Sequence, residues 1–141
     1  MKKDIEEFKD VQLLVRSFYS KVLNDEVLAH FFDFAKDHNW EAHLHKLDSF
    51  WNNVLFYKGG YFGNPLEVHK TLHYYKPLQH SDFTRWVLLF IQTLDDLFEE
   101  KRRRWQNKDP FLLLQLCSII YSQKIQGGFS SNRSDYIVAG C

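Results

Sequence analysis

Apolar side chains recur at steps of three and four residues through most of this sequence, and that period constrains what it can fold into. The clearest run follows Asp10, where one face of a helix would carry Val11, Leu14, Val15, Phe18, Tyr19 and Val22. Residues spaced in this way lie on one side of an α-helix and can be buried together. No segment shows the sustained two-residue alternation, bounded by hairpin turns, that a half-buried strand requires. The sequence therefore predicts an all-α fold.

Capping signals divide the chain into separate helices. We expect Asp10, Asn39 and Ser81 to act as N-caps, because short polar side chains accept hydrogen bonds from the first unpaired N–H groups of a helix. Together with the apolar period, these caps predict helical segments over residues 10–24, 26–34, 40–57, 65–72, 81–98 and 110–126.

Proline and glycine mark further boundaries. A cap followed by proline occurs at Asn64-Pro65 and again at Asp109-Pro110, and proline is favoured at the first position of a helix. The glycine pairs at 59–60 and 127–128 provide stops, because glycine adopts turn conformations that other residues avoid. We expect one domain over residues 1–128, followed by a loosely ordered tail over 129–141.

Charge and cysteine content exclude several classes of function. Lys plus Arg and Asp plus Glu number 18 each, so no net field favours nucleic acid or an anionic membrane. The two cysteines, Cys117 and Cys141, offer neither a framework of disulfides nor a Cys-x-x-Cys pair. The N-terminus is charged and no apolar run approaches membrane-spanning length. We expect a protein of the cytoplasm that binds neither nucleic acid nor membrane.

His69 is the best-placed candidate for chemistry. It follows Asn64-Pro65 and Leu66 on a short predicted helix, in a chain that is 17% aromatic. A neutral imidazole on an apolar face can ligate haem iron, and the aromatic residues could surround a large flat group. His69 and His73 could instead hold zinc as an i, i+4 pair, although no third ligand stands in motif spacing. No nucleophile motif or phosphate-binding glycine loop is present. The residues alone leave open a cofactor site or a histidine packed in an aromatic core.

A set of fragments in fixed order resembles the group III truncated haemoglobins. The fragments are Phe18-Tyr19-Ser20-Lys21-Val22, then His43 with Phe50-Trp51, then Asn64-Pro65-Leu66-Glu67-Val68-His69, then Trp86 with Phe90. The resemblance covers roughly residues 10 to 125, in a family that is bacterial in character. It implies a truncated globin fold, a two-over-two helical sandwich around haem b.

The resemblance also implies roles for individual residues. His69 matches the proximal ligand of the iron. Tyr19 and Trp86 match donors to the bound ligand, and His43 matches a residue that lines or gates the distal pocket. The remaining matches to haem contacts are Phe32, Lys46, Leu47 and Leu66.

The implied function is reversible binding of dioxygen, nitric oxide or carbon monoxide. Two donors aimed at dioxygen would slow its release, which favours redox chemistry such as nitric oxide dioxygenation or peroxide reduction. Dioxygenation would also need a reductase, which this chain does not contain. Two alternatives remain open: a cofactor-free helical interaction domain, and a non-haem metal site built from His69, His73 and a distant carboxylate.

Overall fold

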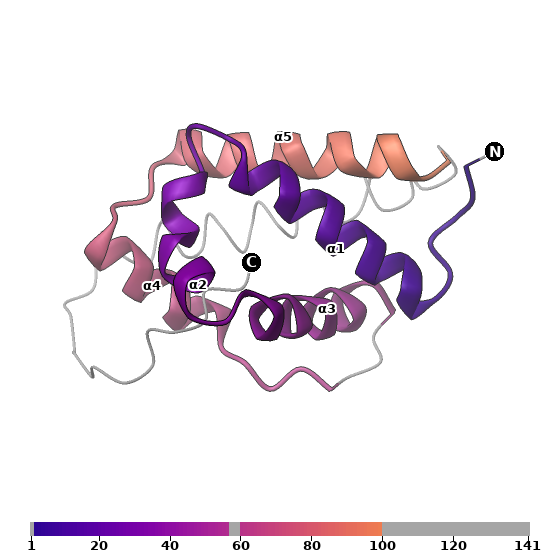
Figure 1. Ribbon diagram of the computed structural model, residues 1–141, viewed down its shortest axis with the longest axis horizontal. Helices are drawn as coiled ribbons and strands as arrows, with labels where there is room; N and C mark the ends of the chain where they lie inside the picture. Colours follow the sequence, from indigo (N-terminus) through magenta and orange to yellow (C-terminus); the bar gives the residue numbers. More distant parts are fainter. Residues whose placement is uncertain (1, 57–59, 100–141) are drawn as a thin grey trace.

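The computed structural model describes residues 2–56 and 60–99, and within these ranges the chain is helical between its loops. The elements, in chain order, are α1 (Phe8–Leu23), the 3-10 turn η1 (Ala29–Phe32), α2 (Asp33–His38), α3 (Trp40–Phe56), α4 (Pro65–Tyr75) and α5 (His80–Leu97) (Figure 1). The described residues form no β-strand. Lys3 and Phe98 pair through an isolated β-bridge. The predicted all-α class is confirmed.

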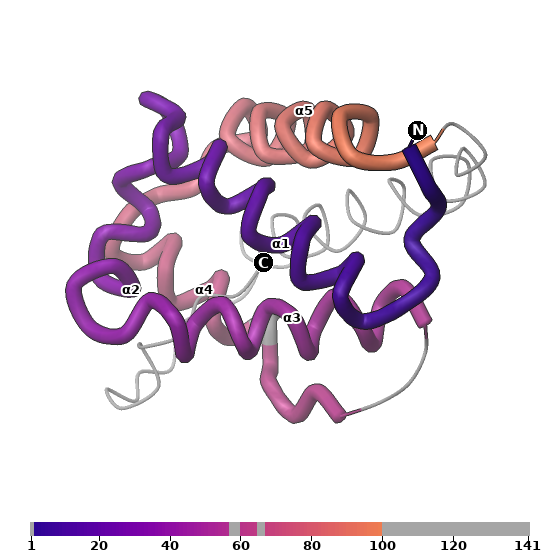
Figure 2. Tube along the Cα trace, turned by 45° about the vertical axis from the view of Figure 1, so that its right-hand side comes forward, coloured from indigo at the N-terminus to yellow at the C-terminus, as the bar shows by residue number. Residues whose placement is uncertain are grey.

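Helix α1 is the centre of the described structure. It lies between α5 on one side and α3 on the other in both views (Figures 1 and 2), and it contacts both helices. Its buried apolar residues are those that the period predicted: Val11, Leu14, Val15, Phe18, Tyr19 and Val22. Burial of large apolar side chains stabilises a fold by roughly 1.5 to 3 kcal/mol each, so this face holds the two flanking helices to α1.

Two predicted N-caps were wrong for the same physical reason. Helix α1 begins at Phe8 and α5 at His80, so Asp10 and Ser81 lie inside the helices rather than before them. In each helix an acidic residue at the third position reaches back to the backbone before the first turn. Asp10 accepts from the N–H of Glu7 at 3.1 Å, and Asp82 accepts from the N–H of Gln79 at 2.8 Å. These are capping boxes, in which the third residue and the cap exchange hydrogen bonds.

The two asparagine caps were predicted correctly. Asn39 accepts a hydrogen bond from the N–H of Ala42 at 3.0 Å at the start of α3, and Asn64 accepts from the N–H of Glu67 at 3.3 Å at the start of α4. Pro65 occupies the first turn of α4 as expected. Helix α3 ends at Phe56, and Gly60 then takes a positive φ of 88°, which supports its predicted role after the helix.

Other boundaries differ from the sequence-based expectation. The segment 26–34 was expected to be one short helix, but it divides into η1 and part of α2, which continues to His38. Helix α4 extends to Tyr75 rather than ending near Leu72. The predicted helix over 110–126 and the tail over 129–141 lie outside the described residues. No helix in the described part of the chain has the length and hydropathy needed to cross a membrane.

Candidate functional site

A mainly apolar cavity brings together two of the predicted site residues from different helices. His69 of α4 and Trp86 of α5 both line it, and so does a third predicted site residue, Phe32 of η1. The other lining residues are Leu28, Phe31, Leu72, Leu78, Asp82 and Phe83. Its free volume is about 40 Å³, which is enough for a water-sized molecule.

The start of α4 holds His69 inside this cavity. Asn64 caps the helix, and His69 lies in its second turn with only 6% of its surface exposed. Leu72, three residues further along, lines the same cavity, as expected for neighbours on one helical face. His69 is therefore a buried imidazole on an apolar wall, as the sequence predicted.

His73 serves the loop between α4 and α5. Its Nδ1 accepts a hydrogen bond from the N–H of Leu78 at 2.9 Å, and Leu78 is itself part of the cavity wall. Among the described residues, no three His, Cys, Asp or Glu side chains are grouped as a metal site would require. Nothing in this region supports the zinc pair of His69 and His73.

The cap of α4 gives a first testable prediction. Asn64→Ala removes the acceptor of the Glu67 N–H and is expected to lower the free energy of unfolding by about 1 kcal/mol. Asn64→Asp retains an acceptor at the positive end of the helix and should remain close to wild type. Urea unfolding of the three proteins tests this, and equal stability of all three would show that the cap does not fix the start of α4.

Trp86 belongs to a stack of aromatic rings. Its ring is parallel to that of Phe90, with centroids 5.7 Å apart, and it meets the edge of Phe18 at 5.0 Å. Trp51 of α3 extends the stack, at 4.6 Å from Phe90 and 6.0 Å from Trp86. The indole Nε1 atoms of Trp51 and Trp86 are buried without a hydrogen-bond partner in the described part of the chain. A buried indole N–H without an acceptor is unfavourable. Trp86 also lines the cavity, so a ligand that brought an acceptor to this N–H would be stabilised.

Tyr19 packs on the same side of the protein. It is fully buried and contacts Phe18 at 4.8 Å, Phe32 at 5.6 Å and Trp40 at 6.3 Å between ring centroids. The contact with Phe32 places Tyr19 directly behind one wall residue of the cavity. Phe18 also contacts Trp86, so Tyr19, Phe32 and Trp86 belong to one group of aromatic contacts around the C-terminal half of α1.

His43 completes this aromatic group from α3. Its ring stacks on Trp40 at 5.1 Å and approaches Phe32 edge-on at 6.3 Å. Both ring nitrogens are buried, and neither has a hydrogen-bond partner among the residues described. Burial lowers the pKa of His43 to about 4, and the positive charge of Lys46 acts in the same direction. His43 is therefore a neutral imidazole at physiological pH.

The low pKa of His43 predicts a pH dependence of stability. Because the folded-state pKa is about 4 and the ordinary value is 6.5, the unfolded chain binds more protons between these values. The stability from neutral His43 is complete above pH 6.5 and is lost as the pH falls towards 4. The protein should lose about 2 kcal/mol between pH 7 and pH 5 through this residue.

Urea unfolding of wild type and His43→Leu at both pH values measures that loss. In His43→Leu, the loss of stability between pH 7 and pH 5 should be smaller than in wild type by about 2 kcal/mol. His45→Leu changes an exposed residue of the same helix and is the control, which should lose as much stability as wild type. An identical fall in wild type and His43→Leu would contradict the low pKa.

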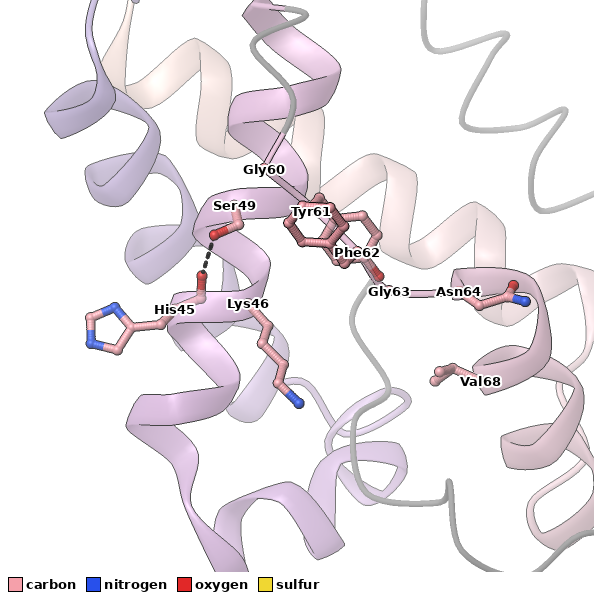
Figure 3. Close-up of a pocket in the computed structure, with 9 residues that line it drawn as sticks. All are labelled: His45, Lys46, Ser49, Gly60, Tyr61, Phe62, Gly63, Asn64 and Val68. Atoms are coloured by element: carbon pink, nitrogen blue, oxygen red, sulfur yellow. Dashed lines mark hydrogen bonds between the residues drawn. The ribbon is translucent and has the colours of Figure 1, made fainter.

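Lys46 and Leu47 occupy different surroundings. Leu47 is fully buried, whereas Lys46 is exposed. Lys46 extends from α3 into an open hollow of about 470 Å³ that is also lined by His45, Tyr61, Asn64 and Val68 (Figure 3). This volume lies in the usual range for cofactor sites. The side chain of Leu66 lies outside the described residues.

The hollow and the apolar cavity lie along the same helix. Val68 lines the hollow and His69, the next residue, lines the cavity. A flat group between α3 and α4 could therefore contact His69 and also reach Lys46.

Sequence reasoning did not identify every residue of the site. It did not predict the contact between Trp40 and His43. Their three-residue spacing on one helix was the signal that could have indicated it. Leu78 lies in the loop after Pro77, where no helical period indicates burial, yet it is 8% exposed and lines the cavity. Only the loop path between α4 and α5 brings it there.

The described part of the chain is thus helical, with a buried histidine and a tryptophan on one aromatic-walled cavity. No model of a protein family matches the sequence. It is 31% identical over 98 residues to the group 3 truncated haemoglobin Ctb of Campylobacter jejuni, an alignment that covers 67% of this chain and 75% of that protein. A crystal structure of the group III truncated haemoglobin from Campylobacter jejuni superposes with a TM-score of 0.68 and 26% identity, covering 92% of this chain and all of the other. The chain belongs to the group III truncated haemoglobins.

Proposed function

We propose that this chain binds haem b (iron protoporphyrin IX) and, through it, dioxygen and similar diatomic ligands, with His69 as the proximal ligand of the iron. The observation that carries the proposal is the shared cavity. It has a buried imidazole on α4 and a buried indole N–H without a described partner on α5. Membership of a haemoglobin family supports the same cofactor.

The residues predicted to hold haem fit it in chemical type. Haem can take an imidazole as its axial ligand, its faces are apolar and pack against apolar or aromatic side chains, and its propionate carboxylates can pair with a cation. His69 would supply the axial imidazole and Lys46 the cation. The apolar contacts would come from Phe32, Leu47 and Leu66. A free volume of about 40 Å³ at the apolar cavity means that the lining side chains have to move apart for the porphyrin.

The polar residues of the site would act on the bound ligand. The iron supplies reversible binding of a diatomic molecule. Tyr19 would donate its hydroxyl hydrogen and Trp86 its indole N–H to the partly negative oxygen. His43, which is neutral and buried, would line the entrance side of this pocket without adding charge.

Haem titration tests the proposal. Purified protein is mixed with haemin, the absorption spectrum is followed to saturation, and the sample is then reduced and exposed to carbon monoxide. We expect one haem per chain, a strong Soret band and a further shift of that band with carbon monoxide. Absence of stoichiometric binding would favour the cofactor-free interaction domain, and zinc or iron found without porphyrin would favour a non-haem site.

We further propose that the haem-loaded protein carries out redox chemistry, either nitric oxide dioxygenation or a peroxidase-like reaction. The donors Tyr19 and Trp86 would retain dioxygen long enough for nitric oxide to react with it. The haem would supply the one electron that formation of nitrate from dioxygen and nitric oxide requires. An external reductase of the cytoplasm would then have to return that electron; a peroxidase-like reaction would similarly need a donor. Nitrate formation from nitric oxide by the dioxygen-loaded protein is the measurement, and loss of nitric oxide without nitrate would contradict it.

A further inference from the structure

Asp25 and Arg85 form an ion pair that joins the end of α1 to α5. Both the Nε and a terminal nitrogen of Arg85 donate to Oδ1 of Asp25, at 2.8 and 2.6 Å. The Asp25 side chain is only 6% exposed, whereas that of Arg85 is 42% exposed. These hydrogen bonds lower the pKa of Asp25, so the carboxylate remains charged at physiological pH.

The other oxygen of Asp25 holds the beginning of one cavity wall. Its Oδ2 accepts from the N–H groups of Val27 and Leu28, each at 3.2 Å. Leu28 starts the stretch that supplies Phe31 and Phe32 to the cavity. One carboxylate therefore fixes the path of the chain from α1 into this wall.

Arg85 connects the same carboxylate to the opposite wall. It directly precedes Trp86 in α5, and Trp86 and Phe83 line the cavity from that helix. A shift or rotation of α5 at Arg85 would move the Trp86 ring against Phe32 and the other residues of the first wall. The pair thus bridges two segments that are 60 residues apart in sequence.

We propose that Asp25 and Arg85 are positioning residues that set the orientation of the Trp86 indole in the ligand pocket. The role in ligand binding rests on the proposed haem function; the effect on the Trp86 ring does not. Arginine is suited to this task because its planar guanidinium holds a carboxylate in a fixed direction, which the single ammonium of lysine does not.

The chain provides a matched control. Lys21 of α1 and Asp96 of α5 also form an ion pair between these helices, with side chains 33% and 65% exposed. Neither residue lines the cavity described above. Loss of this exposed pair removes an ion pair between α1 and α5 without changing any residue that lines the cavity.

The experiment compares Arg85→Met, Arg85→Lys and Lys21→Met with wild type, in protein labelled with 5-fluorotryptophan. The Trp86 fluorine resonance is assigned with Trp86→Phe and recorded with and without haem. We expect Arg85→Met to shift or broaden it, Arg85→Lys to do so less, and Lys21→Met to leave it unchanged. In the haem-loaded protein, Arg85→Met should also shift the carbon monoxide stretching band and speed dioxygen release by roughly threefold to tenfold.

The outcomes separate the two proposals. A Trp86 resonance that is the same in Arg85→Met, Lys21→Met and wild type would overturn the positioning role, whatever the haem content. Failure of wild type to bind haem would overturn the proposed function, while the fluorine spectra would still test the position of Trp86. A shifted resonance with wild-type ligand release and carbon monoxide band would contradict the role in the ligand pocket.

Discussion

Replacing His69 with glycine is expected to abolish stable haem binding, and added imidazole is expected to restore it. Loss of a group that merely supports a metal ligand weakens metal binding roughly tenfold to hundredfold. Loss of the ligand itself should therefore weaken haem binding by at least about a hundredfold. Glycine leaves room on the wall of the cavity, so free imidazole can occupy the place of the missing side chain. Haem titration with and without imidazole gives both affinities.

His73→Gln is the control for this result. His73 lies one turn further along α4, and its Nδ1 accepts the Leu78 N–H, a task that the oxygen of glutamine can take over. The control should bind haem as the wild type does. Equal affinities of wild type and His69→Gly would show that another residue holds the iron.

Tyr19→Phe and Trp86→Phe are expected to release dioxygen faster than wild type. Each change removes one hydrogen-bond donor and keeps an aromatic ring at the position, although phenylalanine is smaller than the indole of Trp86. A hydrogen bond to a charged acceptor contributes roughly 1.5 to 3 kcal/mol, which corresponds to roughly tenfold to hundredfold faster release. Stopped-flow replacement of dioxygen by carbon monoxide measures this rate.

Trp51→Phe provides the matched comparison for the indole. It removes a buried indole N–H from the same aromatic stack, but Trp51 is not among the residues that line the cavity with His69. We expect its release rate to remain within about twofold of wild type, because no donor to the ligand is lost. Unchanged release in both Tyr19→Phe and Trp86→Phe would exclude donation to dioxygen from these residues.

The sequence was most informative where structure depends on local chemistry. The buried face of α1 and the caps at Asn39 and Asn64 follow from residues within one or two turns, and all were predicted. The caps proposed at Asp10 and Ser81 failed because an acidic residue at the third helical position can cap from inside the helix. The sequence alone does not distinguish that arrangement from an N-cap.

Contacts between distant segments were the part that sequence patterns could not provide. Resemblance to a family grouped His69, Trp86 and Phe32 as site residues, and they do line one cavity. The pairing of Asp25 with Arg85 depends on how α1 and α5 pack, and no periodicity of either segment indicates it. Long-range ion pairs of this kind become visible only once the helices are arranged in space.

In the proposed function, His69 holds the iron of a bound haem. Resonance Raman spectra of the ferrous, ligand-free protein, with ordinary and ¹⁵N-labelled histidine, test that bond directly. We expect an iron–histidine stretching band that shifts with the label, persists in His73→Gln and is absent from His69→Gly. A label-sensitive band that remains in His69→Gly without added imidazole would contradict it.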